Sequence, residues 1–386
     1  MSTANPSVGH VSGSSVPPEA YVASLAGFRN MNVHRLGALL RHQSPQEAWQ
    51  VALGQRPASG PIGKVLADSE VRSMWRRCAD ERPPAEIWAR CVSLGLTVLP
   101  YGHNLYPAGL LDDPFPPPVL FARGNLALLA GRRVGIVGTR NATAAGRETA
   151  RALGFGLAAA GVHIVSGLAR GIDGYAHRGA LAAEGTGRPI GIVASGHDVV
   201  YPREHRDLWE AAGNCGLLLT EAPPGVPPEP HRFPLRNRII AALSEVVVVV
   251  ESRERGGSLI TAAQAVERDV TVMAVPGAIG KRASLGTNSL LCDGAAPVTG
   301  VDDVLTALAL QHRRSAVIAA DLRARPRGDD IALYRVVQQD PRTIDGVALA
   351  MGLSLVDSAM GLARLESAGW LAEADGWFEC VGSPLR

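Results

Sequence analysis

Hydrophobic positions in the middle of the chain form short apolar runs separated by longer amphipathic stretches. The clearest run is five consecutive valines at residues 246–250, which is typical of a strand buried on both faces. Similar runs predict strands at residues 133–137, 163–165, 190–193, 217–219 and 271–275, and most intervals are long enough for a helix. This alternation predicts an α/β fold at residues 96–310, an extended Rossmann-like, doubly wound and mainly parallel sheet. Its ligand should bind beyond the carboxyl ends of the strands.

The pattern changes on both sides of this region. Residues 1–18 are rich in Ser, Gly and Pro and are expected to be a disordered tail. Residues 19–95 carry Leu and aromatic side chains near helical spacing and predict a small helical domain. The stretch 96–120 is interpreted as a connector of short strands and proline turns that packs on the sheet. Residues 311–328 have five arginines against one acid and are interpreted as a basic linker.

Residues 329–386 predict a winged helix, because three helices precede two short strands around an Asp375-Gly376 turn. The third helix carries one apolar stripe, formed by Val356, Ala359, Leu362 and Leu365. From Thr343 onward, two basic residues stand against six acids, so the positive charge of a DNA-binding module is missing. We therefore favour a protein-contact or regulatory role for this domain over DNA binding.

Overall composition narrows the class of protein. The formal net charge is only +2, so any contact with nucleic acid must come from a local patch. The five cysteines are scattered and include no Cys-x-x-Cys pair, which indicates a reducing cytosol and no zinc or other metal site. No apolar run approaches the roughly 20 residues that span a bilayer. We expect a soluble cytoplasmic protein without a membrane partner.

The first strand-to-helix turn does not have a dinucleotide fingerprint. Gly135 and Gly138 are three residues apart, and the second strand ends at Ser166 and Gly167, where a ribose-binding acid would stand. No cofactor is therefore predicted. The turn instead presents Arg140 beside a helix N-terminus, which suits a phosphate without a dinucleotide. The alternative is that Gly138 serves only the tight turn and Arg140 is solvated.

The second turn combines small residues with charge. Gly167 would let the backbone approach a ligand, and Arg170 would supply positive charge. Asp173 and His177 lie four residues apart, which on a helix could hold a metal or an acid/base pair. Because no third ligand is evident nearby, we favour the interpretation that Asp173 caps the helix and His177 packs in the core.

Two further turns suggest an anion site. A cationic loop at residues 231–238 precedes the valine strand, and its Arg236 and Arg238 would point to the same side of an extended backbone. After that strand, backbone N–H groups of Gly256, Gly257 and Ser258 would form an anion cradle ahead of a helix beginning near Leu259. We expect the arginines and the amides to converge on one ligand. Because aromatic residues make up only 5% of the chain, base stacking is expected to be minor.

The order and spacing of these motifs resemble the DprA/Smf family. The resemblance is carried by VGIVGTRNAT, VSGLARGIDGYAHRGAL, the pair Tyr201-Pro202, FPLRNRIIAALS, GGSLITAA, AVPG and GTNSLLCDGA. It implies binding of single-stranded DNA, protection of that DNA, and loading of RecA in natural transformation and recombination, by a homodimer. The flanking helical and winged-helix domains also resemble that family's accessory domains. The candidate single-strand site comprises Gly138, Thr139, Arg140, Ser166, Gly167, Arg170, Arg236, Arg238, Gly256, Gly257, Ser258, Thr261 and Asn288.

Two other functions stay open. A related Rossmann-like family, the phosphoribohydrolases formerly called lysine decarboxylases, cleaves nucleoside monophosphates with a PGGxGTxxE loop. Here the similar turn is GGSLITAAQ, and if Thr261 matches that threonine, Gln264 stands where the catalytic glutamate would be. An amide cannot act as a general base, so we expect binding without catalysis. The other alternative is a sensor of a small nucleotide that signals to the acidic winged helix.

Overall fold

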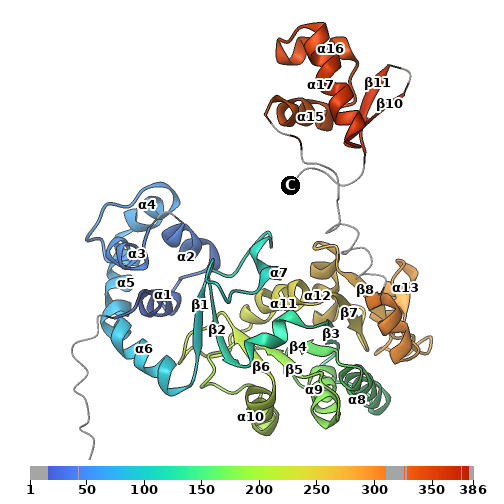
Figure 1. Cartoon of the computed structure of the whole chain (residues 1–386). Coiled ribbons are helices and arrows are strands. Elements are labelled where there is room, and N and C mark those ends of the chain that lie inside the picture. The colour runs from blue at the N-terminus through green and yellow to red at the C-terminus, as the bar shows by residue number, and fades with distance from the viewer. Residues whose placement is uncertain (1–15, 42, 310–325, 327, 375, 382–386) are drawn as a thin grey trace, which may run out of the picture. The chain divides into compact units, whose positions relative to one another are not determined.

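The computed structural model describes residues 16–41, 43–309, 326, 328–374 and 376–381 (Figure 1). Most of the predicted tail and almost all of the predicted basic linker lie outside these residues. The chain divides into two compact units, residues 1–308 and 309–386, and each is described by itself.

The first unit begins with a bundle of six helices. Its core contains Leu25, Phe28 and Trp75, with Trp75 fully buried. The predicted helical stretch is broken into separate helices, and polar side chains of Asn32 and Ser44 accept backbone N–H groups at two of the starts. The helices are α1 (Pro18–Ala26), α2 (Val33–Leu40), α3 (Pro45–Ala52), α4 (Gly60–Ala67), α5 (Ser69–Glu81) and α6 (Pro84–Ser93).

A nine-stranded sheet forms the rest of the first unit, in the order β1-β2-β6-β5-β4-β3-β7-β8-β9. The predicted connector supplies two of these strands: β1 pairs antiparallel with β2, and β2 pairs antiparallel with β6. All other pairs are parallel, as predicted. The strands are β1 (Thr97–Pro100), β2 (Val119–Gly124), β3 (Arg133–Val137), β4 (His163–Ser166), β5 (Pro189–Ile192), β6 (Leu217–Thr220), β7 (Val246–Val249), β8 (Thr271–Ala274) and β9 (Ala296–Pro297).

Helices cover both faces of the sheet (Figure 1). Side chains of β7 alternate between the two layers: Val246 and Val248 pack with α8 and α9, whereas Val247 and Val249 pack with α11 and α12. The prediction of a strand buried on both faces is confirmed. The helices are α7 (Ala108–Leu111), α8 (Ala144–Ala159), α9 (Ile172–Ala182), α10 (Arg206–Cys215), α11 (Arg232–Leu243), α12 (Gly257–Val266) and α13 (Leu285–Cys292), and residues 301–309 are also helical.

Strand order places a topological switch point at the centre of the sheet. From β3 the chain proceeds through β4, β5 and β6 on one side, and it later returns to β7 on the other side of β3. The turns that follow β3 and β7 therefore leave the sheet in opposite directions. In open α/β sheets, such a point is where ligands commonly bind.

The second unit contains three helices and an antiparallel strand pair around a core that includes Tyr334 and Trp370. The predicted apolar stripe is only partly buried: Leu362 and Leu365 are in the core, but Val356 is 67% exposed. No single described helix is long and apolar enough to cross a membrane. The elements are α15 (Asp329–Gln339), α16 (Ile344–Met351), α17 (Leu355–Ser367), β10 (Leu371–Ala374) and β11 (Trp377–Cys380).

Candidate functional site

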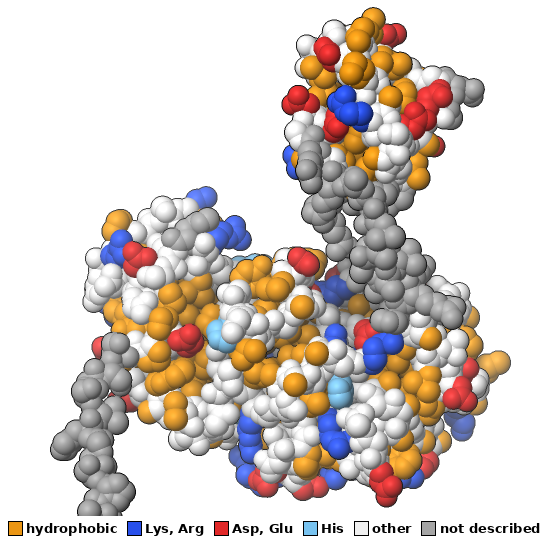
Figure 2. Space-filling model, in the orientation of Figure 1, with side chains coloured by type: hydrophobic (Ala, Val, Ile, Leu, Met, Phe, Trp, Pro, Cys, Tyr) orange, Lys and Arg blue, Asp and Glu red, His pale blue; other side chains and the backbone are white. Residues whose placement is uncertain are grey.

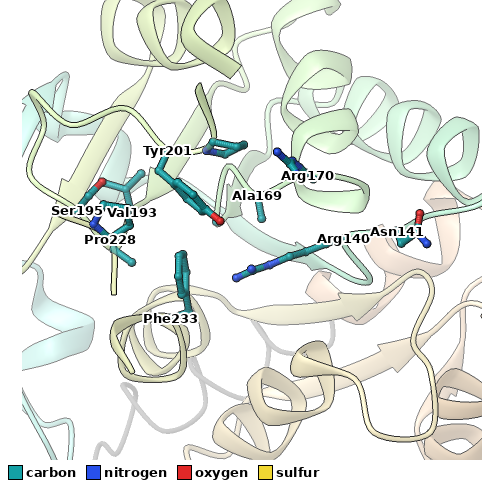
Figure 3. Close-up of a pocket in the computed structure, with 12 residues that line it drawn as sticks. Arg140, Asn141, Ala169, Arg170, Val193, Ser195, Tyr201, Pro228 and Phe233 are labelled. Carbon is teal, nitrogen blue, oxygen red and sulfur yellow. The ribbon is translucent and has the colours of Figure 1, made fainter. Parts of the chain in front are cut away.

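A pocket of about 260 Å³ opens at the carboxyl ends of β3, β4 and β5 (Figure 3). Three neighbouring strand ends supply its base, and the first turn of α11 supplies one wall. This is the edge of the sheet at which the sequence predicts the ligand. The pocket is lined by Arg140, Asn141, Gly167, Ala169, Arg170, Val193, Ala194, Ser195, Tyr201, Pro202, Pro228 and Phe233.

One wall of the pocket combines a cation with two aromatic rings. The guanidinium carbon of Arg140 lies 4.5 Å from the centre of the Phe233 ring, and the Phe233 and Tyr201 rings are 5.5 Å apart (Figure 3). Arg140 and Tyr201 are exposed, while Phe233 is half-buried. Flat π surfaces beside a guanidinium suit a ligand that has both a planar ring and a negative charge.

Arg170 lies at the same pocket but shares its charge. Its guanidinium forms an ion pair with Glu204, and both side chains are about half exposed. This hydrogen bond raises the pKa of Arg170 and lowers that of Glu204. An exposed ion pair of this kind is weak, so a phosphate could compete for the arginine.

The structure contradicts the prediction for Arg236 and Arg238. Helix α11 begins at Arg232, ahead of both residues. Pro234 does not prevent this, because it lies in the first turn of the helix, where a proline is tolerated. Residues two apart on a helix point roughly 200° apart, so the two guanidiniums do not share a groove. Both residues are only 6% exposed. The expectation that both arginines point to the same side of an extended backbone and face one ligand is wrong.

Arg236 instead holds two strand ends together from beneath the pocket. Its Nη1 donates to the carbonyl oxygens of Gly167, at 2.7 Å, and of Ile192. Burial lowers the pKa of Arg236 to about 10, while buried Asp173 opposes that change, so the guanidinium stays charged at neutral pH. A Cβ at Gly167 would collide with this guanidinium, which explains the glycine. Arg236 therefore supports the floor of the pocket rather than facing a ligand.

Arg238 points away and pairs with an acid that the sequence pattern does not suggest. It forms an ion pair with Glu221, with side chains 7% and 20% exposed. Burial raises the pKa of Glu221, and the charge of Arg238 opposes that change. Residues 230–243 contain no acid, so the neutralising partner had to come from another element, the end of β6.

The predicted glycine cradle is only partly available. Helix α12 begins at Gly257, two residues earlier than expected, and the N–H of Gly256 already donates to the carbonyl of Arg253, at 3.0 Å. The Ser258 hydroxyl donates to the Ser252 hydroxyl, at 2.9 Å, and is buried. Thr261 is 2% exposed. None of the residues of this turn lines the pocket, so the arginines and amides do not converge there.

Several other predicted site residues have structural roles. Gly138 and Thr139 form the tight turn after β3, and the N–H of Thr139 donates to the carbonyl of Glu251, at 2.8 Å. The buried Ser166 hydroxyl donates to the carbonyl of Ile136. The Asn288 side chain bonds both the N–H and the carbonyl of Gly277, which closes a turn. Of the predicted set, the pocket brings together Arg140, Gly167 and Arg170.

The helix N-terminus expected beside Arg140 is already occupied. The carboxylate of Glu251 accepts the backbone N–H of Thr143, at 2.9 Å, and the Thr143 hydroxyl. Arg140 itself extends toward Phe233 (Figure 3). In this structure the helix end beside Arg140 is therefore bonded by Glu251, while the Arg140 side chain lies at the pocket.

Asp173 and His177 are buried groups of the second turn. Asp173 accepts the N–H of Gly167, at 3.1 Å, instead of capping α9, whose N-cap is Gly171. His177 is fully buried, as the packing interpretation predicts, and burial lowers its pKa to about 4. Among the described residues, no group of three or more His, Cys, Asp or Glu side chains could hold a metal.

Sequence reasoning missed the aromatic part of the pocket. The low aromatic content made stacking look unimportant, yet Tyr201 and Phe233 lie together beside Arg140. Both residues belong to motifs singled out in the sequence, Tyr201-Pro202 and FPLRNR, so the signal was present. Only the fold shows that these motifs, about 30 residues apart, meet at one strand edge.

The region that contains the sheet and the pocket is similar to a known protein family. Residues 97–309 match the family model of DNA recombination-mediator protein A. The DNA processing protein DprA of Bacillus subtilis is 42% identical over 215 residues, which cover 55% of this chain and 72% of that protein. The structure of DprA from Streptococcus pneumoniae matches with a TM-score of 0.61 and 31% identity, over 74% of this chain and 95% of that one. DprA from Helicobacter pylori, whose structure describes its single-stranded DNA binding mode, matches with a TM-score of 0.50 and 29% identity, over 55% of this chain and 95% of that one.

Proposed function

This chain belongs to the family of DNA recombination-mediator protein A, the DprA/Smf family, and we propose that it binds single-stranded DNA at the Arg140–Phe233 pocket without cleaving it. The observation that carries this proposal is the guanidinium of Arg140 lying over Phe233, with Tyr201 beside the ring. A phosphate can take the charge while a base stacks on an aromatic face. The H. pylori protein, which binds single-stranded DNA, supports the same ligand.

The chemistry of this pocket suits binding with little sequence preference. Every base has a π face, and every nucleotide has a phosphate, so neither contact reads a particular base. The net charge of +2 also means that attraction to DNA depends on local groups such as Arg140 rather than on the whole surface. The expected ligand is therefore a single strand of any sequence.

Gln264, on helix α12, supports binding without hydrolysis. If Thr261 matches the threonine of the phosphoribohydrolase loop, Gln264 stands where the catalytic glutamate would be, and an amide cannot act as a general base. In the structure its amide group bonds Glu267 and Arg268, at 2.8 and 2.9 Å, on the surface of α12. It does not line the pocket. A nucleotide sensor would use the same pocket, and titration with a nucleotide and with oligonucleotides distinguishes it from a protein that binds single strands.

The proposal also includes loading of RecA, protection of the strand and formation of a homodimer. These parts rest on membership of the family alone. The assay for loading is RecA ATPase activity on single-stranded DNA coated with a single-strand binding protein. We expect the chain to shorten the lag before ATP hydrolysis, and an unchanged lag would remove this part of the proposal. Size-exclusion chromatography with light scattering measures the dimer.

The acidic second unit has a separate proposed role in protein contact. Hydrophobic side chains lie among acidic ones on its surface (Figure 2). Its third helix exposes Val356 and Met360, one turn apart, and Arg364 on the same helix is engaged by Asp330. A face of this kind suits a protein better than a phosphate backbone.

The ligand is tested by titrating the full chain with a free nucleotide, with oligothymidylates of rising length, and with a duplex. Fluorescence anisotropy should show affinity that rises with strand length, weakens with salt and falls for the duplex. A nucleotide sensor would instead bind the mononucleotide as tightly as any oligomer. Tight, salt-insensitive binding of the mononucleotide alone would refute the proposal.

A further inference from the structure

The N-terminus of α8 holds an internal anion. Thr143 is the N-cap of this helix, and its hydroxyl accepts the N–H of Gly146, at 3.0 Å. Glu251, the second residue after β7, reaches across the switch point to the same place. Its carboxylate accepts the backbone N–H of Thr143, at 2.9 Å, and the Thr143 hydroxyl.

The half-buried side chain of Glu251 packs against the backbone of the first turn of α8. A Cβ at Gly146 would collide with its carboxyl carbon and both of its oxygens, so the glycine leaves the space that this side chain fills. The backbone is fixed as well, because the carbonyl of Glu251 accepts the N–H of Thr139, at 2.8 Å. The side chain and the main chain of one residue thus join the turns that follow β3 and β7.

This carboxylate lies at a position where doubly wound sheets bind phosphate. In doubly wound sheets, the turn after the first parallel strand and the helix N-terminus that follows it are where a phosphate binds. A carboxylate carries the same sign of charge and accepts the same N–H groups. The helix cap alone does not require it, because the Thr143 hydroxyl already accepts the N–H of Gly146.

We propose that Glu251 is a specificity-determining residue, a built-in anion that closes the switch point to free phosphate and to nucleotide phosphates. If the proposed function holds, a strand then binds at the pocket that contains Arg140 and Phe233. Arg140 lies three residues before Thr143, so this pocket is close to the closed helix end. A purely structural Glu251 would affect stability only. A specificity role predicts that its removal creates a new anion site.

The test measures binding of inorganic phosphate to the full chain by isothermal titration calorimetry. Glu251→Ala and Glu251→Ser both empty the space of the carboxylate, whereas Glu251→Gln fills it without charge. Glu254→Ala, which removes an exposed acid from the same turn, is the matched control. Each Glu251 variant is also made together with Arg140→Ala, so that phosphate at the Arg140–Phe233 pocket is not mistaken for phosphate at α8.

We expect Glu251→Ala and Glu251→Ser to bind phosphate at least tenfold more tightly than the wild type, with or without Arg140. Glu251→Gln and Glu254→Ala should bind phosphate no more tightly than the wild type. Folded Ala and Ser variants that gain no phosphate affinity would overturn the proposal. So would a wild type whose phosphate binding survives Arg140→Ala. Failure of all forms to bind oligonucleotide would instead refute the proposed function, and the phosphate result would stand.

Discussion

Replacing Arg140 by alanine should weaken binding of single-stranded DNA without unfolding the protein. The side chain is exposed, and its contact is with the Phe233 ring, so its loss costs the free protein only about 0.5–1 kcal/mol. A charged hydrogen bond to a phosphate contributes about 1.5–3 kcal/mol, which corresponds to a roughly 10- to 150-fold weaker Kd. One lost phosphate contact should also reduce the slope of log K against log salt by about 0.7.

The assay is fluorescence anisotropy of a labelled oligothymidylate at a series of KCl concentrations. Arg140→Lys should fall between the wild type and Arg140→Ala, because lysine keeps the charge but loses the planar guanidinium. Arg151→Ala is the matched control, since Arg151 is exposed, pairs with Glu148 and lies outside the pocket. If Arg140→Ala melts like the wild type and keeps both its Kd and its salt slope, the pocket is not the strand site.

Three further predictions concern stability and the second unit. Arg236→Ala should lower the free energy of unfolding by about 1–3 kcal/mol, because it leaves the carbonyls of Gly167 and Ile192 without their donor, and urea denaturation would measure this. A loss below about 1 kcal/mol would show that Arg236 supports no structure. Burial lowers the pKa of His177 and of His197 to about 4, against 6.5 in an unfolded chain, so the unfolded state binds more protons between these values. The free energy of unfolding should therefore fall as pH drops from 6.5 to 4, by about 3 kcal/mol for each histidine. In His177→Leu, the free energy of unfolding measured with urea should depend less on pH, and an unchanged pH profile in that variant would contradict the assignment. Deleting residues 325–386 should leave the affinity for oligonucleotide within tenfold, about 1.4 kcal/mol, and a greater loss would show that the second unit holds DNA.

The sheet could be predicted from the sequence because its signal is local. Parallel strands covered on both faces need continuous apolar runs, and each run in the central region became a strand within one or two residues. The turns at the strand ends were also predicted, and Arg140, Gly167 and Arg170 do meet at the pocket. Fold class and the edge of the sheet that carries the site therefore followed from short-range patterns.

The side chains that face the ligand depend on contacts between distant segments. Arg236 could be taken for a surface residue because nothing beside it in the sequence shows the two carbonyls that it bonds, from Gly167 and Ile192. Likewise, Glu251 lies 108 residues from Thr143, and their hydrogen bonds appear only once β3 and β7 are adjacent. A motif gives residue types in order, but it does not show which partners the fold brings to them.

The antiparallel pair β1–β2 has a practical consequence for fragments of this protein. A fragment beginning at Val134 would remove both strands and leave β6, Leu217–Thr220, as the outer strand. All four of its residues are buried in the intact chain, and their unpaired N–H and C=O groups would then face water. An exposed, apolar edge of this kind pairs readily with other chains and promotes aggregation. A soluble fragment carrying the pocket should therefore begin before Thr97, so that β1 and β2 still shield the sheet.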